Sequence, residues 1–332
     1  MKLKAGIIGL GKIASLYEED ERAKAYYSYL THAGSYFKHP AVELACGSDI
    51  NKDRLKRFGL TWGVSRLYDN YDKMLEENNI DILSICTYPE VHYDIIKSAS
   101  KRVRVIFCEK PFARDCREIQ SIIELKKRTG VKIAINLYRE YDRSHIRIRN
   151  SLVTGEYGKI QRVNCYYGKG LRNMGSHLIG YLIGTLGILK KIKVLSKTKY
   201  RGVQEFTYDV YLEFNGGIPA MLQSCDFNSY RLFEIDFICQ KGRVQVLDEG
   251  LSIKLCKVRK NRAESGAFEL GESRRNPKST IGQALYYAVD HLVELSRNKE
   301  VEPIVSPERY LYLQRIIEEI ERQGCAIPCL QN

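Results

Sequence analysis

The spacing Gly9-x-Gly11-x-x-Ala14 is suited to holding the pyrophosphate of a dinucleotide. A short apolar run, residues 5–8, precedes it and is typical of a buried strand, and a helix-compatible segment follows from Lys12. Gly9 permits a tight turn, Gly11 lets the backbone approach a pyrophosphate, and Ala14 allows the helix to pack closely on the strand. Amides at the start of the helix would then hold the phosphates. An ordinary turn is the alternative, but the position directly after a strand favours a nucleotide site.

An acidic residue, Asp49, ends the second expected strand, residues 42–48. At this place a carboxylate binds the ribose hydroxyls and so selects NAD. Asp49 lies 49 − 14 = 35 residues beyond Ala14, whereas the usual spacing is about 20. We therefore interpret residues 17–30 as an insertion near the phosphate turn, which could be part of a substrate-side lid. Two alternatives stay open: a longer first helix, or an Asp49 that only caps the following helix.

Strands and helices alternate through the rest of the first half of the chain. The expected strands at residues 82–86, 103–108 and 131–136 are separated by segments whose apolar residues have helical spacing. This alternation predicts a parallel, doubly wound sheet. Ligands of such sheets bind beyond the carboxyl ends of the strands. The residues at those ends are Gly9, Asp49, Thr87, Glu109, Lys110 and Asn136.

The second half of the chain has a different pattern. Six strands are expected with no helix between most of them, which predicts an antiparallel sheet; they are residues 159–167, 207–214, 218–225, 232–238, 243–247 and 251–258. A helix is expected near residues 175–186 and a polar loop over 264–278. Two helices, near residues 281–296 and 307–323, close the chain.

The composition is that of an ordinary globular protein, with 44% hydrophobic and 28% charged residues in 332. No run of about 18 apolar residues marks a membrane-spanning helix, so no membrane partner is expected. The first strand begins almost at once, which leaves no room for a signal peptide. The ten cysteines are scattered, as buried thiols of a cytoplasmic protein are. Cys325 and Cys329 are the close pair, and their spacing is not a convincing metal motif, so no metal is expected.

The net charge of 53 − 40 = +13 could attract nucleic acid. The basic residues are mixed with acidic ones instead of forming one arm, so we expect no nucleic-acid partner. A phosphate-bearing small substrate also fits this charge, and a solvated basic surface fits it best.

Four sequence blocks resemble, in the same order, the glucose-fructose oxidoreductase, inositol dehydrogenase and MocA (Gfo/Idh/MocA) family. They are GLGKIA at 9–14, SICTYPEVH at 84–92, CEKP at 108–111 and NMGSHLIG at 173–180. The resemblance spans essentially the whole chain. It implies an α/β Rossmann domain that binds NAD, with NADP as the other option, over residues 1–136. It also implies an α+β domain with an open, mostly antiparallel sheet for substrate binding and oligomerisation over residues 137–332, and a homodimer or homotetramer. The final helix could pack back on the Rossmann domain.

The resemblance also implies which residues are catalytic. The lysine of the family's Glu-Lys-Pro block matches Lys110, which would approach the nicotinamide ribose and a substrate hydroxyl and could polarise it. The family's Asp-x-x-x-His pair matches Asn173 and His177, which a spacing of four places on one helix face. Asn173 departs from the family pattern because an amide can orient a hydroxyl but cannot exchange a proton. Gly180 is a second departure, since an Asp is common there. Lys110 and His177 therefore remain as the acid/base candidates.

Further residues are expected around the two ligands. Those expected at the cofactor are Gly9, Gly11, Lys12, Ile13, Ala14, Asp49, Thr87, Pro89, His92, Glu109 and Lys110. His92 follows Pro89 at a helix start and is expected to be structural rather than catalytic. Those expected at the substrate are Asn136, Arg139, Arg172, Asn173 and His177. Arg172 would suit a phosphate or carboxylate on the substrate, and a solvated surface position is its alternative.

These expectations together describe a cytoplasmic NAD(P)-dependent dehydrogenase or reductase. It would transfer a hydride between the nicotinamide and a hydroxyl or keto carbon of a sugar, and the basic residues favour a nucleotide sugar or another anionic sugar. Two alternatives remain: an imine, enamine or other non-sugar reductase of the same fold, and a dinucleotide-binding regulatory protein with weak or no catalysis. Asn173 and Gly180 are the residues that suggest the regulatory protein.

Overall fold

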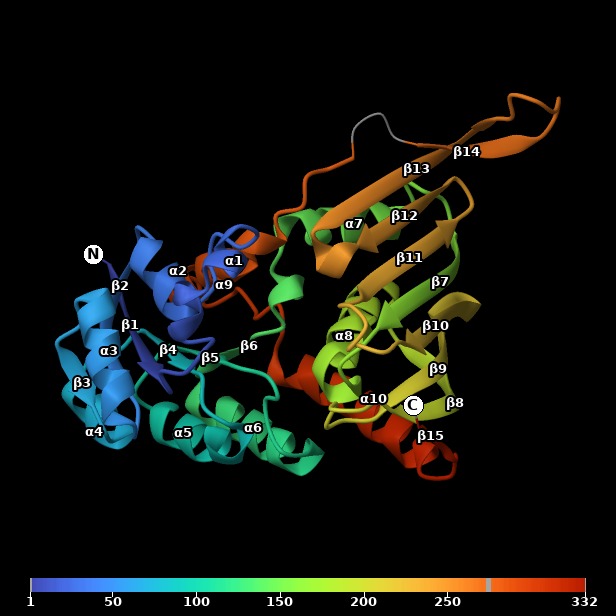
Figure 1. Ribbon diagram of the computed structural model, residues 1–332. Helices are drawn as coiled ribbons and strands as arrows, with labels where there is room; N and C mark the ends of the chain where they lie inside the picture. Colours follow the sequence, from blue (N-terminus) through green and yellow to red (C-terminus); the bar gives the residue numbers. More distant parts are fainter. Residues whose placement is uncertain (1, 273–275, 332) are drawn as a thin grey trace. The chain divides into compact units, whose positions relative to one another are not determined.

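The computed structural model describes residues 2–272 and 276–331 (Figure 1). The chain divides into two compact units, each with its own sheet. Unit 1 contains the residues up to Asp142 together with Gly282–Gln314, and unit 2 contains Arg143–Ile281 together with the residues from Arg315 onward. None of the helices in the described ranges combines the length and the apolar character that crossing a bilayer requires.

Unit 1 is built on a six-stranded sheet in the order β3-β2-β1-β4-β5-β6, with every pair parallel. The chain runs outward from β1 to one edge, returns to β4 and runs to the other edge, which is the doubly wound arrangement. The sequence prediction of this fold is confirmed. The strands are β1 (Leu3–Ile8), β2 (Val42–Ser48), β3 (Arg66–Tyr68), β4 (Ile82–Ile85), β5 (Val105–Cys108) and β6 (Lys132–Ile135).

Helices connect these strands and begin and end at capping residues. Asn51 caps α3 by accepting a hydrogen bond from the Arg54 amide, and Gly63, with φ 68°, ends it. Asp115 and Gly130 do the same for α6. The helices of unit 1 are α1 (Glu21–Lys24), α2 (His32–Lys38), α3 (Lys52–Trp62), α4 (Tyr71–Glu77), α5 (His92–Ala99), α6 (Cys116–Thr129), α9 (Ala284–Arg297) and the first part of α10 (Pro307–Gly324).

The segment after the glycine turn differs from the regular helix that the sequence predicts from Lys12. Turns lead into a short 3₁₀ helix, η1 (Leu16–Glu19), and then into the four-residue α1. The next regular helix is α2. At its start, the His32 and Ala33 amides donate to the carbonyls of Ile13 and Ala14 over 3.2 and 2.9 Å. The intervening residues therefore interrupt what would otherwise be a continuous crossover from β1 to β2.

Unit 2 contains a nine-stranded sheet in the order β14-β13-β12-β11-β7-β10-β9-β8-β15. Its pairs are antiparallel except β7 with β10 and β8 with β15, so the predicted open, mostly antiparallel sheet is confirmed. The strands are β7 (Ile160–Tyr167), β8 (Leu189–Lys199), β9 (Thr207–Phe214), β10 (Ile218–Ser224), β11 (Phe233–Cys239), β12 (Gly242–Leu247), β13 (Ser252–Lys260), β14 (Phe268–Glu272) and β15 (Cys329–Gln331). Its helices are α7 (Arg143–Val153) and α8 (Ser176–Leu186), and the second part of α10 also belongs to it.

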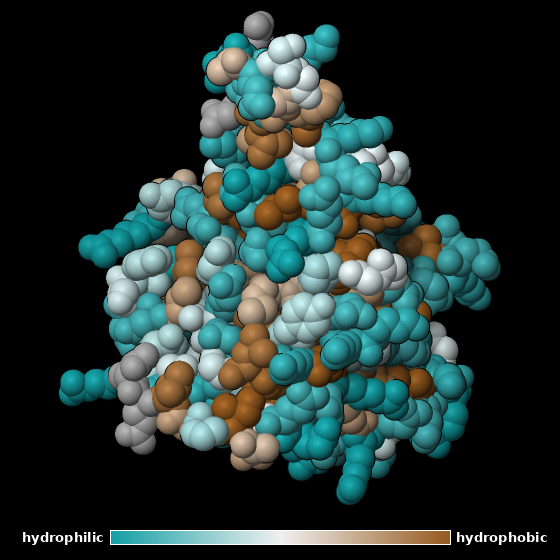
Figure 2. All heavy atoms as spheres, turned by 90° about the vertical axis from the view of Figure 1, so that its right-hand side faces the viewer, coloured by the Kyte–Doolittle hydropathy of each residue, from teal (hydrophilic) through white to brown (hydrophobic). Residues whose placement is uncertain are grey.

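One face of the unit 2 sheet is buried and the other is only partly covered. In β9 the residues Val210, Leu212 and Phe214 are buried and alternate with half-buried neighbours, as the period of two requires. Figure 2 looks onto the side where this sheet lies in Figure 1 and shows hydrophobic residues scattered among hydrophilic ones. The sequence expectation of a loop over residues 264–278 is wrong at β14, which pairs with β13. Residues 273–275 of that expected loop lie outside the described residues.

Candidate active site

The two glycines of the predicted phosphate turn meet different constraints. Gly9 has φ +83°, and a Cβ there would lie 2.9 Å from the carbonyl carbon of Cys86 and 2.9 Å from Thr87 Cγ2. Only glycine can both adopt this positive φ and avoid these close contacts. A Cβ on Gly11 would have no atom of the described residues within 4 Å, its own residue and its two chain neighbours aside. Gly9 is therefore needed by the fold itself, whereas the space beside Gly11 is open to a ligand.

Asp49 joins the end of β2 to the glycine turn. Its Oδ2 accepts a hydrogen bond from the Leu10 amide at 2.7 Å, and its Oδ1 accepts one from the Asn51 amide at 2.8 Å. Arg54 lies 3.6 Å from Oδ2. An ionised carboxylate has about four acceptor positions, so these two amides leave capacity for a further donor such as a ribose hydroxyl.

The end of β4 carries one unsatisfied hydroxyl and one well-anchored histidine. Thr87 Oγ1 is buried and has no hydrogen-bond partner among the described residues. His92 is fully buried, with Nε2 3.1 Å from the Thr87 carbonyl and Nδ1 3.0 Å from the Phe112 carbonyl. Burial lowers the pKa of His92, and a neutral ring, which has a single N–H, donates to one of these two carbonyls. This geometry supports the structural role expected for His92.

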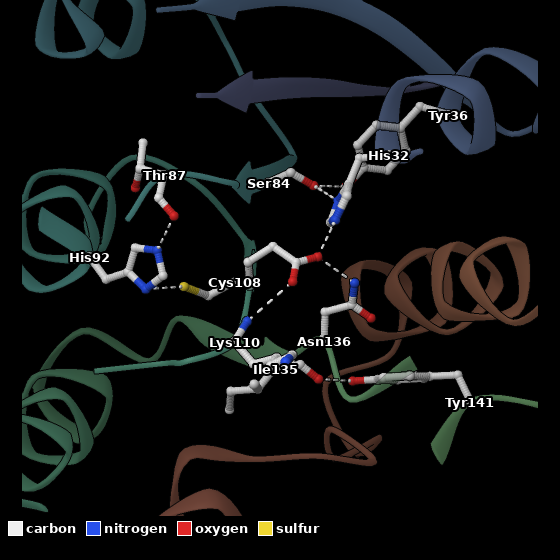
Figure 3. A network of polar contacts seen from close by, with 11 residues as sticks. His32, Tyr36, Ser84, Thr87, His92, Cys108, Lys110, Ile135, Asn136 and Tyr141 are labelled. Atoms are coloured by element: carbon white, nitrogen blue, oxygen red, sulfur yellow. Dashed lines mark hydrogen bonds and ion pairs between the residues drawn. The ribbon is translucent and has the colours of Figure 1, made fainter. Parts of the chain in front are cut away.

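Glu109, directly after β5, is the centre of a buried polar network; Figure 3 labels its partners His32, Lys110 and Asn136. Its Oε1 accepts hydrogen bonds from His32 Nε2 at 2.9 Å and from Asn136 Nδ2 at 2.5 Å, and its Oε2 lies 3.2 Å from the Lys110 amide. Burial alone would raise the pKa of Glu109, but the hydrogen bond and electrostatic attraction of His32 foremost, then the hydrogen bond from Asn136 and the charge of Lys110, outweigh burial and hold this pKa below its usual range. Glu109 is thus an ionised carboxylate that fixes the peptide of Lys110.

The network continues into residues that the sequence analysis did not select. His32 Nδ1 lies 2.8 Å from Ser84 Oγ, which in turn lies 2.7 Å from the Tyr36 hydroxyl. All three residues are almost fully buried. Ser84 is the residue that could have indicated this network from the sequence. It is a polar residue inside the apolar strand β4, and a buried polar side chain needs a hydrogen-bond partner.

Asn136 and Arg139 follow β6 as predicted, and both are buried. Asn136 is 4% exposed, and its Oδ1 has no hydrogen-bond partner among the described residues. Arg139 is 2% exposed, and its guanidinium lies 4.6 Å from the centre of the Tyr138 ring. Arg139 is therefore not a solvated surface residue.

Backbone hydrogen bonds align the strand ends of unit 1. The amide of Gly9 donates to the Ser48 carbonyl at 2.8 Å, that of Glu109 to the Ile85 carbonyl at 2.9 Å, and that of Asn136 to the Cys108 carbonyl at 2.8 Å. The structure thus brings one set of predicted residues to a single edge of the sheet. We call this set the strand-end site: Gly9, Gly11, Asp49, Thr87, Glu109, Lys110 and Asn136.

Asn173 and His177 belong to unit 2 and are placed by an irregular helix start. A π-helical turn, η4 (Leu171–Gly175), runs directly into α8, and Gly170 before it has φ +94°. The Asn173 amide donates to Glu205 Oε2 at 3.0 Å, and its carbonyl accepts from Ser176 Oγ at 2.7 Å. His177 is 5% exposed. Such π turns frequently occur at functional sites, which agrees with the role expected for this segment.

Arg172, in the same turn, is engaged by a carboxylate. Its Nε and a terminal guanidinium nitrogen lie 2.7 and 2.6 Å from the two carboxylate oxygens of Glu321. This bidentate hydrogen bond, foremost, raises the pKa of Arg172. Its positive charge is largely compensated, so Arg172 does little to favour an anionic substrate.

The strand-end site fits a bound dinucleotide. Gly11 leaves open space where a pyrophosphate would approach the backbone. Asp49 keeps acceptor capacity at the end of β2, and Thr87 Oγ1 and Asn136 Oδ1 are buried polar atoms that lack partners within the described part of the chain. Buried polar atoms of a native protein are normally paired, so these two are candidates for bonds to a ligand.

Comparison with known proteins agrees with this fold. Residues 3–137 match the family model GFO_IDH_MocA, described as "Oxidoreductase family, NAD-binding Rossmann fold". A curated relative, the myo-inositol 2-dehydrogenase of Thermotoga maritima, is 24% identical over 157 residues. That match covers 47% of this chain and 42% of the relative, so the chain spans less than half the length of this protein.

Two solved structures share the fold over almost the whole chain. An NAD-binding oxidoreductase from Klebsiella pneumoniae has a TM-score of 0.80 at 14% identity, covering 98% of each chain. A 3-ketoreductase from Actinomadura kijaniata, crystallised with TDP-benzene and NADP, has a TM-score of 0.73 at 15% identity, covering 100% of each chain. The Rossmann region of this chain therefore matches the Gfo/Idh/MocA oxidoreductase family, and its full-length fold is that of oxidoreductases of known structure.

Proposed function

We propose that this protein is an NAD(P)-dependent dehydrogenase or reductase that acts on a CH–OH or keto carbon. The observation that carries the proposal is the strand-end site, in which an open glycine turn, an acid after β2 and the Glu109–Lys110 peptide share one edge of a parallel sheet. Ligands of doubly wound sheets bind at this edge.

The cofactor proposed is NAD, with NADP as the second option. The turn at Gly11 would receive the pyrophosphate, and Asp49 would accept the ribose hydroxyls. Thr87 and Asn136 would bond groups near the nicotinamide end. When bound, the cofactor supplies or accepts the hydride, and the protein supplies position and proton transfer.

Lys110 is proposed as the main acid/base group. It directly follows Glu109, whose carboxylate lies near the Lys110 amide and so restrains the start of that residue. His177 is proposed as the second proton-transfer group and Asn173 as a residue that orients a substrate hydroxyl. The support for these two is their place on the π turn and on α8 and their match to the family's motif.

The proposed substrate is a sugar or cyclic polyol. The Thermotoga maritima relative is a myo-inositol 2-dehydrogenase by name. A nucleotide sugar is the second candidate, supported by the fold shared with a ketoreductase that was crystallised with TDP-benzene. The contact of Arg172 with Glu321 reduces the support for a charged substrate, so we place the neutral polyol first.

A substrate panel tests this proposal. Purified protein is mixed with NAD or NADP and with inositols, neutral sugars, sugar phosphates and nucleotide sugars, and the absorbance of reduced nicotinamide is followed. Cyclic imines with NADH test the non-sugar reductase. Turnover of a polyol or sugar with NAD is the expected result. Tight NADH binding with no turnover of any compound would instead indicate the regulatory protein.

We propose that the protein is a homodimer or homotetramer formed through the sheet of unit 2. Partly exposed apolar side chains on its strands support this, among them Leu195, Val258, Leu270 and Leu330 (Figure 2 shows this side of the molecule). Light scattering coupled to gel filtration measures the mass, and a 38.3 kDa particle would contradict the proposal.

A cytoplasmic location is also proposed. Burial raises the pKa of the thiols of Cys46 and Cys165, and buried, unreactive thiols of this kind are typical of proteins kept in a reducing compartment. Cell fractionation with an antibody to the protein tests this location.

A further inference from the structure

The buried chain Tyr36–Ser84–His32–Glu109 ends at the peptide of the proposed acid/base residue. The successive contacts are 2.7, 2.8 and 2.9 Å, and none of the family blocks in the sequence contains His32 or Tyr36 (Figure 3). His32 is 1% exposed and is the first residue of α2. Its location, between a strand serine and the carboxylate next to Lys110, calls for a functional explanation.

The hydrogen atoms of this chain can be assigned from its partners. Among the described residues, the Tyr36 hydroxyl has Ser84 Oγ as its hydrogen-bond partner. If Tyr36 donates to Ser84, Ser84 donates to His32 Nδ1, and His32 Nε2–H donates to Glu109, then each hydrogen has one acceptor. A doubly protonated ring would donate from Nδ1 to Ser84 and leave one hydroxyl hydrogen without an acceptor. The geometry therefore favours the neutral Nε2–H tautomer.

The chain cannot carry a proton to solvent. Tyr36 is fully buried and Ser84 is 0% exposed, so the chain ends inside the core. A relay that removes protons from the site needs an exit, and these residues do not offer one. The remaining role is to fix the carboxylate of Glu109.

We propose that His32 is a positioning residue for the reaction: as the Nε2–H tautomer it holds Glu109, and through Glu109 it sets the place of Lys110 and Asn136. Glu109 accepts from His32 and Asn136 on one oxygen and faces the Lys110 amide with the other. Loss of the His32 donor would let the carboxylate rotate away from both partners. This inference rests on the proposed function for its catalytic consequence, but the state of the ring does not depend on that function.

The same unit contains a matched control. His39, at the other end of α2, also has Nε2 2.9 Å from a carboxylate oxygen, that of Asp290, and its ring lies 5.1 Å from the ring of Tyr286. The ring of His32 lies 5.1 Å from that of Phe107. His39 is 6% exposed and does not contact the strand-end site through any hydrogen bond described here. A change at His39 should thus affect stability in the same way as a change at His32, without moving Lys110.

The experiment has two independent readouts. The first is the ¹⁵N NMR spectrum of the histidine rings in the protein without cofactor, with His32 assigned by its absence in His32→Gln. A neutral ring protonated at Nε2 at neutral pH is expected, and a charged ring or an Nδ1–H tautomer would overturn the assignment. This readout holds whether or not the protein turns over any substrate, so it separates the inference from the proposed function.

The second readout compares kcat and NADH binding in four variants. His32→Phe should lower kcat by about 100-fold, the size expected for a displaced catalytic group, while the Kd for NADH stays within about threefold because the glycine turn is unchanged. His32→Gln, which keeps a donor near the position of Nε2, should recover most of kcat. Ser84→Ala should fall between the wild-type protein and His32→Phe, and His39→Phe should retain kcat. Equal losses in His32→Phe and His39→Phe, or a kcat in His32→Phe within about twofold of wild type, would refute the positioning role.

Discussion

His32 Nε2 lies 2.9 Å from Glu109 Oε1, although 77 residues separate them in the sequence. The contact links the start of α2, just beyond residues 17–30, to the residue that precedes Lys110. The glycine turn and the proposed acid/base residue are therefore coupled through one buried carboxylate, because His32 also donates its backbone amide to the carbonyl of Ile13.

Substituting each glycine of the turn should separate folding from binding. Gly9→Ala places a Cβ 2.9 Å from backbone atoms at φ +83°, so it should lower the free energy of unfolding by about 1–3 kcal/mol. Gly11→Ala has open space and should change stability by less than about 0.5 kcal/mol. Its methyl group would nevertheless occupy the place of the pyrophosphate. Fluorescence titration with NADH should show at least about tenfold weaker binding in Gly11→Ala; unchanged NADH affinity would contradict the assignment of the turn.

Asp49→Asn should weaken the preference for NAD over NADP. The substitution removes the negative charge that would repel a 2′-phosphate. Asp49 accepts hydrogen bonds from two backbone amides, and the NH₂ group of an asparagine would face one of them. We expect the ratio of the two dissociation constants to shift toward NADP by about tenfold. Asp53→Asn, an exposed acid in the first turn of α3, is the control and should leave the ratio unchanged.

Stability should decrease in mild acid because of His92. Burial lowers the pKa of His92 below the ordinary value of 6.5. Between the native pKa and 6.5, the unfolded chain therefore binds a proton at His92 that the native protein does not. The stabilising contribution is complete above pH 6.5 and is lost as the pH falls through the lower, native pKa. Urea unfolding at a series of pH values should show a falling midpoint below this pH, with a smaller fall in His92→Gln. The same dependence in both proteins would show that other groups cause it.

Arg172→Ala should affect stability more than substrate binding. The guanidinium is held by both oxygens of Glu321, with side chains 38% and 30% exposed, and a partly exposed pair of this kind contributes about 0.5–1 kcal/mol. Arg172→Ala and Glu321→Gln should therefore lower the melting temperature by similar amounts. A large rise in KM for nucleotide sugars alone, in Arg172→Ala and not in Glu321→Gln, would restore Arg172 as a phosphate-binding residue.

Much of the fold could be predicted from the sequence because its signals are local. Apolar runs followed by polar residues predicted five of the strands in unit 1, and β9 was predicted by strict alternation. The elements that were missed have weak local signals. β8 (Leu189–Lys199) is rich in lysine, and α7 (Arg143–Val153) alternates charged and apolar residues, so tertiary packing decides both.

Residues of the site could be predicted only where they belong to a sequence motif. Gly9, Gly11 and Asp49 were predicted from residue type and position after a strand, and Lys110 from its match to the family's Glu-Lys-Pro block. His32, Ser84 and Tyr36 were not predicted, because their relation depends on contacts over 48, 52 and 77 residues. The bidentate pairing of Arg172 with Glu321 likewise joins residues 149 positions apart, and no local pattern indicates it.

The kcat of Lys110→Met, measured together with its NADH affinity, tests the central claim most directly. Methionine keeps the length of the side chain but cannot transfer a proton, so kcat on the substrate found in the panel should fall by about 10²- to 10⁴-fold. The Kd for NADH should stay within about threefold, because the glycine turn and Asp49 are untouched. A Lys110→Met protein that binds NADH and retains the kcat of the wild type would contradict the account.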